Sequence, residues 1–213
     1  MVKNGIVTIV NAQYNSIVIP RDIDVDKVIL NTVKAEELKV ESGAVYEVSI
    51  HSGVIDTLKV NAPAVTGISR NQLLQMIKDK VVVTEDMLLQ FTAYTQTMDA
   101  IANLQPKLIT YGATTVEKVM VGGNVKFYAN DCAINDIAVN AAEAYESLEV
   151  ELYGYAGAVD VAIDRNKEDG YCLTTLNLFD SDITTVNVSG TDGSLYIAGD
   201  SDADKVQISG ANA

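Results

Sequence analysis

The sequence predicts a mainly β protein built as a parallel β-solenoid, with a helical segment inserted between two arrays of repeats. A six-residue unit, in which apolar residues occupy the first, fourth and sixth positions, occurs at 173–178 and again at 183–188. The same unit begins at residues 25, 35, 45 and 55, an unbroken period of ten. Between the arrays the apolar spacing changes to that of a helix. Repetition on this scale is typical of quasi-one-dimensional folds.

Each repeat unit is expected to form one half-buried strand. Its last two apolar residues lie two positions apart and share one face of a strand, while the residue between them faces water. We expect the Thr-Thr and Asn positions of 173–188 to face solvent in this way. A small residue and a glycine follow many units, as at Ser52-Gly53 and Ser189-Gly190, and would form tight corners. Further units occupy 116–121, 134–139, 145–150, 159–163 and 203–208.

The size of one solenoid coil follows from strand geometry. A ten-residue coil would enclose almost no interior, because about 3.3 Å per residue gives a perimeter of only about 33 Å. Two units with two short strands, about 20 residues in all, make a coil that can hold a core. An antiparallel β-sandwich or meander is the alternative, since ten-residue spacing is also normal there. The solenoid is favoured because the corners lack the Asn-Gly and Asp-Gly pairs of hairpins.

Three segments follow from this pattern: an N-terminal β repeat array at 1–68, a helical segment at 69–106 and a C-terminal β repeat array at 107–213. Ser69 and Gln72 form a capping-box pattern that begins a first helix. Thr84 is expected to cap a second, longer helix that ends before Pro106.

The second predicted helix carries an apolar seam with heptad spacing. Its residues are separated by four, three, four and three positions, as at the a and d positions of about two heptads: Met87, Phe91, Tyr94, Met98 and Ile101. Two roles remain open for this seam. It could pack on the β arrays or cover an open end, or it could associate with the same helix of other copies as a dimer or trimer.

Composition restricts the classes of partner. The chain has 213 residues, 48% apolar and 21% charged, which is typical of a folded protein with one large or two small domains. With 29 acidic and 15 basic residues the net charge is −14, which repels nucleic acid and anionic membranes. No run approaches the roughly 18 apolar residues of a membrane-spanning helix, and the short apolar run after Met1 does not resemble a signal sequence. We therefore expect neither nucleic-acid nor membrane partners, and no export signal.

The sequence contains few residues of the kinds that act in catalysis. His51 is the single histidine, and its position beside Ser52-Gly53 predicts a corner residue. No Gly-x-Ser-x-Gly nucleophile motif or Gly-rich phosphate loop occurs. Cys132 and Cys172 are too few for a disulfide framework and are expected to be buried free thiols. The sequence thus predicts a protein that is not an enzyme and has no cofactor.

Paired carboxylates offer the main exception. Glu36 with Glu37, and Asp180 with Asp182, could act as the two acids of a glycoside-active β-helix enzyme. They occupy solvent-facing or corner positions of the repeat, however, where acidic residues also serve solubility. We therefore predict a solvated acidic face and keep the carbohydrate-active enzyme as an alternative.

A metal site is not expected, although one stretch resembles a calcium loop. Asp200, Asp202 and Asp204 alternate as at the start of an EF-hand loop. Lys205 stands where that loop needs a glycine, and Ala211 where it needs a bidentate glutamate. The sequence leaves calcium binding at these aspartates open.

The units at 173–178 and 183–188 resemble the abbreviated leucine-rich or β-solenoid repeats of bacterial surface proteins. They are also similar to β-helical stretches of bacteriophage fibre and decoration proteins. This resemblance implies an extended, rigid surface used for assembly or adhesion, and it transfers no catalytic or ligand-binding residues.

These expectations favour a non-enzymatic structural protein of a bacteriophage virion, such as a head fibre, decoration or tail accessory subunit. Its expected partners are other copies of itself, as a homo-oligomer that includes the trimer, and other structural proteins, with a surface glycan or receptor as a further partner. The virion is preferred because a secreted adhesin should carry an export signal or anchor. The alternatives are a bacterial adhesin or binding module of leucine-rich-like repeats, at the cell surface or secreted, and the carbohydrate-active enzyme.

Overall fold

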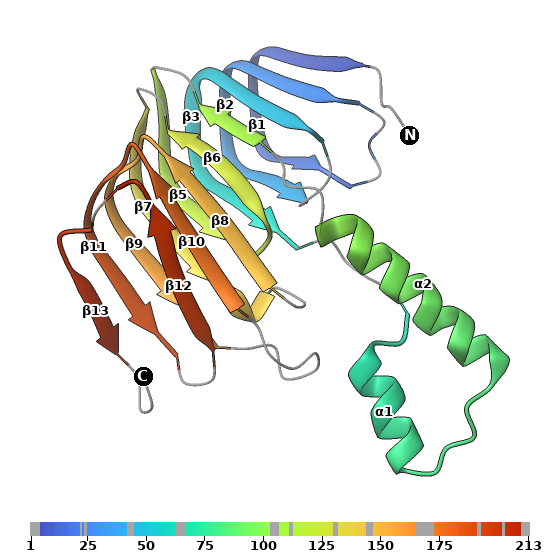
Figure 1. Cartoon of the computed structure of the whole chain (residues 1–213). Helices are drawn as coiled ribbons and strands as arrows, with labels where there is room; N and C mark the ends of the chain where they lie inside the picture. Colours follow the sequence, from blue (N-terminus) through green and yellow to red (C-terminus); the bar gives the residue numbers. More distant parts are fainter. Residues whose placement is uncertain are drawn as a thin grey trace.

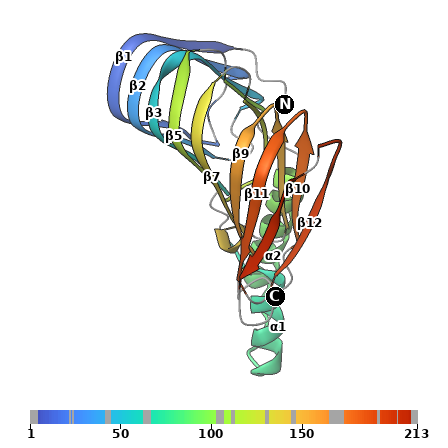
Figure 2. The ribbon, with the colours of Figure 1, turned by 90° about the vertical axis from the view of Figure 1, so that its left-hand side faces the viewer.

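The protein is mainly β, with one curled parallel sheet and two helices that project from it (Figures 1 and 2). The computed structural model describes residues 5–21, 23, 25–41, 45–62, 67–102, 107–110, 113–129, 132–143, 147–164, 173–190, 193–201 and 203–209. Of residues 98–102 and 143 it describes only the backbone. Met98, Ile101, Cys172 and Asp202 are therefore sequence-predicted residues whose side chains lie outside the described part.

Three long strands begin the sheet. They are β1 (Ile6–Ile19), β2 (Lys27–Glu41) and β3 (Glu47–Asn61), and each pairs in parallel with the next. Ile6 pairs with Lys27 and Lys27 with Glu47, so the register advances by about twenty residues from strand to strand. Each of β2 and β3 therefore contains two predicted units, and the expectation that each unit forms a strand of its own is wrong for these two strands.

The long strands bend near their middle. The backbone has a positive φ at Asn11 (51°), Thr32 (56°) and Gly53 (156°). Ser52 and Gly53 thus lie inside β3, and the expectation that they end a strand is wrong. His51 is an exposed residue of the same strand interior instead of a corner residue. Glycines do follow the ends of β5 and β11, as predicted, at Gly122 and Gly190.

Beyond the helices the sheet continues as two branches that both start on β3. The first half of β3 pairs with β4 and the second half with β5. The first branch is, in spatial order, β4 (Lys107–Thr110), β6 (Val125–Ala129), β8 (Ser147–Tyr153), β10 (Leu173–Phe179) and β12 (Ser194–Gly199). The second branch is β5 (Thr114–Val121), β7 (Ala133–Asn140), β9 (Ala156–Ala162), β11 (Asp182–Ser189) and β13 (Val206–Ser209).

Every strand pairing within the described residues is parallel. The antiparallel sandwich or meander that the sequence left open is therefore wrong. The lack of Asn-Gly and Asp-Gly pairs at the corners predicted parallel strands correctly, because parallel strands need no hairpin turns.

The core consists of columns of aliphatic side chains at equivalent positions of successive strands. In-register parallel pairing places these positions directly beside one another. One column runs through the second branch and the long strands, and its buried members are Ile17, Leu38, Leu58, Val119, Ile137, Val159 and Val186. Val206 of β13 ends this column and is exposed.

Polar side chains from one strand satisfy the bent backbone of its neighbour. A bend removes amide groups from the strand ladder and leaves them needing an acceptor. The Thr32 amide donates to Ser52 Oγ at 3.0 Å, the Asp180 amide to Asp200 Oδ1 at 3.1 Å and the Ser181 amide to Ser201 Oγ at 2.9 Å. Each acceptor lies twenty residues after its donor, the same step as the strand register.

The repeat unit predicts burial correctly in β11 but not in β10. In β11, Ile183, Val186 and Val188 are buried, and a register shift between Ile183 and Thr185 absorbs the extra polar residue. In β10 the side chains simply alternate, so Thr174 is fully buried and Leu173 is exposed. The expectation that Thr174 faces solvent is wrong.

The helices begin where their caps predict. In α1 (Arg70–Lys78) the Ser69 hydroxyl accepts from the Gln72 amide at 3.2 Å, and the Ser69 amide donates to Gln72 Oε1 at 2.9 Å. Thr84 Oγ1 accepts from the Met87 amide at 3.3 Å at the start of α2 (Glu85–Ala102). A short 3₁₀ helix, η1 (Ala141–Glu143), follows β7.

Candidate assembly surface

The two helices form a hairpin that leaves the sheet between β3 and β4. We call residues 67–102 the helical hairpin; it extends well away from the sheet in both ribbon views (Figures 1 and 2). No residue of α1 is buried. The hairpin therefore gains little from the core that stabilises the rest of the chain.

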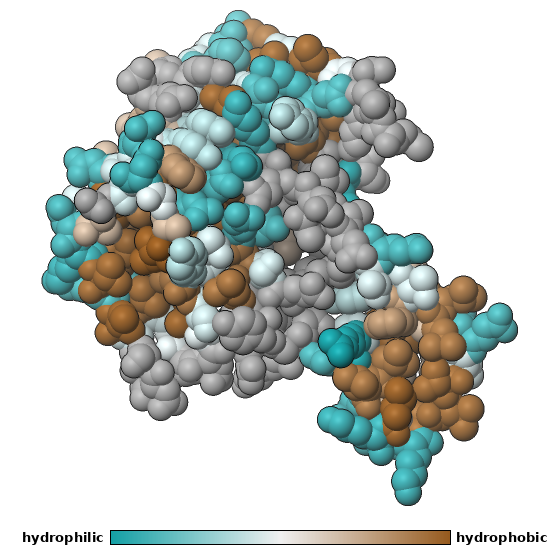
Figure 3. All heavy atoms as spheres, viewed as in Figure 1, coloured by the Kyte–Doolittle hydropathy of each residue, from teal (hydrophilic) through white to brown (hydrophobic). Residues whose placement is uncertain are grey.

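Apolar side chains are exposed towards the end of the hairpin that is farthest from the sheet. Figure 3 shows them as a group of hydrophobic residues on the projecting part. Val82 is 80% exposed and Leu89 63%. Together with these two, the hairpin patch consists of Leu74, Ile77, Val81 and Leu88. Soluble monomers seldom expose contiguous apolar surface of this kind, and where they do it commonly marks an interaction site.

The predicted seam of α2 lies only partly in this exposed region. Tyr94 is buried, at 7% exposure, and Met87 and Phe91 are half-buried. Gly67 lies against the same helix, since a Cβ on Gly67 would be 3.0 Å from Tyr94 Cβ. Tyr94 thus packs at the base of the hairpin instead of facing outward. The use of the seam for oligomerisation stays a prediction.

The sequence held a signal for the exposed patch that heptad spacing did not detect. Val81 and Val82 belong to an apolar run between two helices, where a connection is normally polar. Leu74 and Ile77 lie on a nine-residue helix that lacks a buried face.

A second candidate surface is an aromatic ladder on the outer side of the first branch. Tyr128, Tyr153 and Phe179 occupy paired positions of β6, β8 and β10. Their rings stack with centroids 4.3 Å and 4.7 Å apart, and Lys107 Nζ lies 4.7 Å from the centroid of Tyr128. A sugar binds by stacking on a free aromatic face, but both faces of Tyr128 and Tyr153 are occupied. The ladder therefore stabilises the branch and offers little surface to a glycan.

The ladder is joined to a nearly buried carboxylate. Glu151 Oε2 lies 3.0 Å from Lys126 Nζ and accepts a hydrogen bond from the Tyr153 hydroxyl at 2.7 Å. Burial and this hydrogen bond raise the pKa of Tyr153, and the hydrogen bond to Glu151 raises the pKa of Lys126. The raised pKa values mean that Tyr153 and Lys126 both keep their protons at neutral pH, which fits a structural network.

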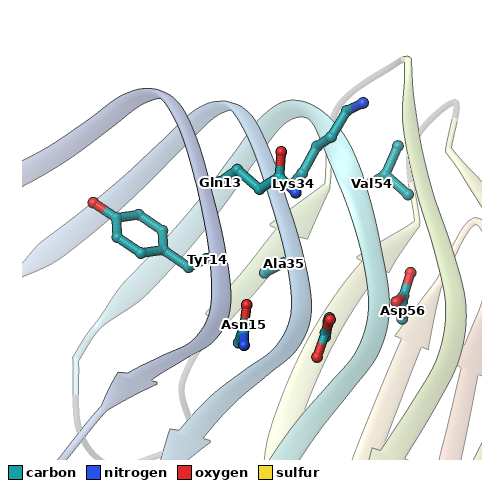
Figure 4. Close-up of a pocket in the computed structure, with 8 residues that line it drawn as sticks. Gln13, Tyr14, Asn15, Lys34, Ala35, Val54 and Asp56 are labelled. Atoms are coloured by element: carbon teal, nitrogen blue, oxygen red, sulfur yellow. The ribbon is translucent and has the colours of Figure 1, made fainter.

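A groove of about 260 Å³ lies on the outer side of the long strands (Figure 4). Its charged groups are Lys34, Glu36 and Asp56, and its other lining residues are Gln13, Tyr14, Asn15, Ala35 and Val54. The lining contains no histidine, cysteine, serine or threonine that could act as a nucleophile or base beside the carboxylates. The groove can hold a small polar ligand through hydrogen bonds and charge.

The structure places Glu36 and Glu37, one of the two carboxylate pairs that the sequence offered, in different surroundings. Glu36 lines the groove, whereas Glu37 forms ion pairs with Lys59 and Lys39, which lower the pKa of its carboxyl group. Asp180 lies in a left-handed bend, with φ of 48°, and Asp182 is exposed at the start of β11.

The remaining candidates do not form a site. Asp200 accepts hydrogen bonds from the Asp180 amide and from the Ser201 hydroxyl. Across the described ranges, no three His, Cys, Asp or Glu residues are grouped so that they could hold a metal ion. Cys132 is a free thiol, as predicted, but it is half-buried, with the Thr110 hydroxyl 2.8 Å from its Sγ.

Neither helix, within the part of the chain that is described, combines the length and the apolar character needed to cross a membrane. Comparisons with protein-family models, curated proteins and solved structures find no match to this chain.

Proposed function

We propose that this chain is a non-enzymatic structural subunit that assembles with copies of itself through the helical hairpin and presents its sheet as a rigid surface. The observation that carries the proposal is the hairpin patch, which projects from the sheet and exposes six aliphatic side chains. The proposed partners are other copies of the same chain, in a dimer or a trimer.

Helix energetics support a partner for the hairpin. Isolated helices shorter than about 12–15 residues are marginal in water, so most helical stability in proteins comes from packing of an apolar face. The nine residues of α1 have no buried member within one copy. A second copy would supply the missing packing.

The size of the hairpin patch is sufficient for association. Complete burial of an aliphatic side chain is worth about 1.5–3 kcal/mol, so covering six half-exposed ones contributes about 1 kcal/mol each. Two copies together would gain on the order of 12 kcal/mol, which is comparable to the roughly 4–15 kcal/mol lost in rigid-body freedom on association. The patch therefore supports a modest, concentration-dependent oligomer.

We also propose that the curled sheet is a β-solenoid with coils of about 20 residues and two strands per coil. Each long strand would form both strands of one coil, and each later coil would join one strand of each branch, such as β4 with β5. The register step of about twenty residues and the bend hydrogen bonds of the same step support this proposal. Such a scaffold would give the subunit its rigidity.

The proposed setting is a bacteriophage virion, where the subunit would serve as a head fibre, decoration or tail accessory protein. The repeat resemblance supports this setting, and the exposed hairpin supports the assembly role. Other structural proteins of the particle are the further partners.

The groove of the long strands supports a second candidate, a cell-surface module that binds a glycan or receptor. Lys34, Glu36 and Asp56 would hold polar groups of such a ligand. Titration of the protein with acidic and neutral oligosaccharides would test it, with Asp56→Asn as the variant. Binding that Asp56→Asn leaves unchanged would contradict a role for the groove.

Sedimentation velocity tests the assembly role directly. The wild-type chain should sediment as an oligomer of its 22.8 kDa subunit, and Val82→Glu combined with Leu89→Glu should remove the hairpin contact and lower the mass of the oligomer at the same protein concentration. The control is Val54→Glu, which places one glutamate at an exposed valine of β3 and should leave the oligomer intact. A wild-type chain that stays monomeric at every concentration would contradict the proposal.

A further inference from the structure

Both ends of the sheet present strand edges without a partner in the described part of the chain. At one end β1 pairs only with β2. At the other end β12 pairs only with β10, and β13 only with β11. Each free edge carries a row of backbone amides and carbonyls that could accept another strand.

These edge strands lack the charged residues and prolines that often protect an edge from pairing. Natural edge strands are commonly blunted by charged side chains, proline or bulges. None of the residues of β1, β12 or β13 is charged, whereas β2, which is paired on both sides, carries several lysines and glutamates. Ile6 of β1 is 66% exposed and Ile208 of β13 is 63% exposed. Figure 3 also shows apolar residues over the strands at the C-terminal end of the sheet.

We propose that a second copy of this chain docks end to end, with its β1 adding as a parallel strand to the free edge formed by β12 and β13. The direction of the strands favours this arrangement. Because all described strands are parallel, a copy displaced along the stack presents β1 in the same direction as β13. Two β1 edges related by a two-fold axis would have to pair antiparallel.

The side-chain register also matches across the proposed contact. Val206 and Ile208 end two core columns that begin with Ile17 and Ile19 of β1. In each strand the two residues are separated by one residue, so the next copy would continue both columns. The contact would cover Leu195, Ile197 and Ala203, which pack against the core but stay partly exposed at the C-terminal end.

The continued core columns identify the occupant as another copy, and local charge does not oppose the contact. Copies with a net charge of −14 repel one another at long range, and this repulsion opposes contact least where local charge is absent. The two sheet ends are such places, since both sets of edge strands are uncharged. Added salt should strengthen the contact, because it screens the long-range repulsion and leaves strand pairing unaffected.

End-to-end docking deepens the proposed structural function, on which it rests, and uses residues outside the hairpin patch. The two contacting surfaces differ, so the association is heterologous and extends into a chain of copies unless it closes into a ring. The hairpin would then link copies sideways and the sheet ends would link them lengthwise.

Complementary blocking of the two ends tests the proposal. All proteins carry Val82→Glu and Leu89→Glu, which disable the hairpin patch. The protein with these two substitutions alone is called the parent. One variant adds Val10→Glu and Val18→Glu on β1, and another adds Val206→Glu and Ile208→Glu on β13. Each blocked variant alone should sediment as a monomer, the unblocked parent should form oligomers whose mass rises with concentration, and an equimolar mixture of the blocked variants should form a dimer.

The control variant carries Val54→Glu and Leu173→Glu, two exposed positions on strands that are paired on both sides, and should behave as the parent. A parent that stays monomeric at all concentrations and salt levels overturns end-to-end docking while leaving the hairpin result intact. A dimer formed by the β13-blocked variant alone overturns it as well, in favour of contact between two β1 edges.

Hydrogen exchange on the parent protein provides a measurement that does not depend on how the end variants fold. The amides of β1, β12 and β13 should exchange more slowly at high protein concentration than at low, and those of β3 should not change. Exchange of the edge strands that is independent of concentration overturns the proposal.

Discussion

The carbonyl oxygen of Val33 occupies the place where a side chain on Gly53 would begin, since an ideal Cβ on Gly53 would lie 2.2 Å from that oxygen. Gly53 also has a φ of 156°, which other residues rarely adopt. We expect Gly53→Ala to lower the free energy of unfolding by about 2–4 kcal/mol, through clash and backbone strain. Urea denaturation checks this, with Val54→Ala as the control, which should change stability by less than about 0.5 kcal/mol.

Thr174 offers a stabilising substitution. Its hydroxyl is fully buried and, within the described residues, has no hydrogen-bond partner. Thr174→Val removes the unsatisfied group at nearly constant volume and should raise the free energy of unfolding by about 1 kcal/mol. The matched control is Thr110→Val, because the equally buried Thr110 hydroxyl lies 2.8 Å from the Tyr128 carbonyl oxygen. That variant should lose about 1 kcal/mol, and equal effects of the two substitutions would contradict the hydrogen-bond argument.

We expect the free energy of unfolding to fall at high pH because of Tyr155. Its hydroxyl donates to the Ala158 carbonyl at 2.8 Å, and burial, with Asp136 and Asp160 nearby, raises its pKa from 10.0 to about 12. The folded state thus holds the proton more tightly, so the stabilisation is complete below pH 10 and disappears as the pH rises through about 12. Tyr155→Phe should be about 1 kcal/mol less stable than wild type at neutral pH.

The difference between Tyr155→Phe and wild type should shrink and then reverse in alkaline solution, because phenylalanine cannot ionise in the unfolded chain. Urea unfolding of both proteins between pH 7 and pH 12 measures the difference. A difference that stays constant over this range would contradict the assigned pKa.

The sheet should fold without the helical hairpin. Residues 42–46 connect β2 to β3, and residues 62–106 make the equivalent connection from β3 to β4. Replacing 62–106 with the sequence of 42–46 should remove the helical circular dichroism signal and preserve cooperative unfolding, because α1 has no buried residue. Loss of a cooperative transition would show that the hairpin is part of the folding unit, and the Val82→Glu, Leu89→Glu protein serves as the control that keeps both helices.

The repeat unit predicted the strands of the second branch well because a bulge makes it distinctive. Ile183, Val186 and Val188 have a three-then-two spacing that plain alternation does not produce. In the first branch β6 alternates simply and β4 has only four residues, so neither strand showed a recognisable unit and both were missed. Thr174 was predicted on the wrong face of its strand. Residues 173–178 have the same three-then-two apolar spacing as the bulged strand β11, but β10 has no bulge and simply alternates.

The helix caps were predictable because they depend on local hydrogen bonds, such as the pair between Ser69 and Gln72. The exposed hairpin patch was predictable only in part. The apolar connection at Val81 and Val82 is visible in the sequence, but Leu74 and Leu89 are equally compatible with core positions until the position of the helix is known. The aromatic ladder of Tyr128, Tyr153 and Phe179 likewise depends on a register that no single strand reveals.

In the sheet Glu47 pairs with Lys107 in the same way as Lys27 pairs with Glu47. The helical hairpin lies between Glu47 and Lys107 in the chain, and not between Lys27 and Glu47. The pairing of the strands is thus the same whether or not the hairpin lies between them. Loop-closure entropy rises only slowly with length, so such an addition imposes little thermodynamic penalty. Evolution could therefore exchange, lengthen or delete this segment as a module while the sheet stays under separate selection, and related chains could differ in this segment while sharing one supporting sheet.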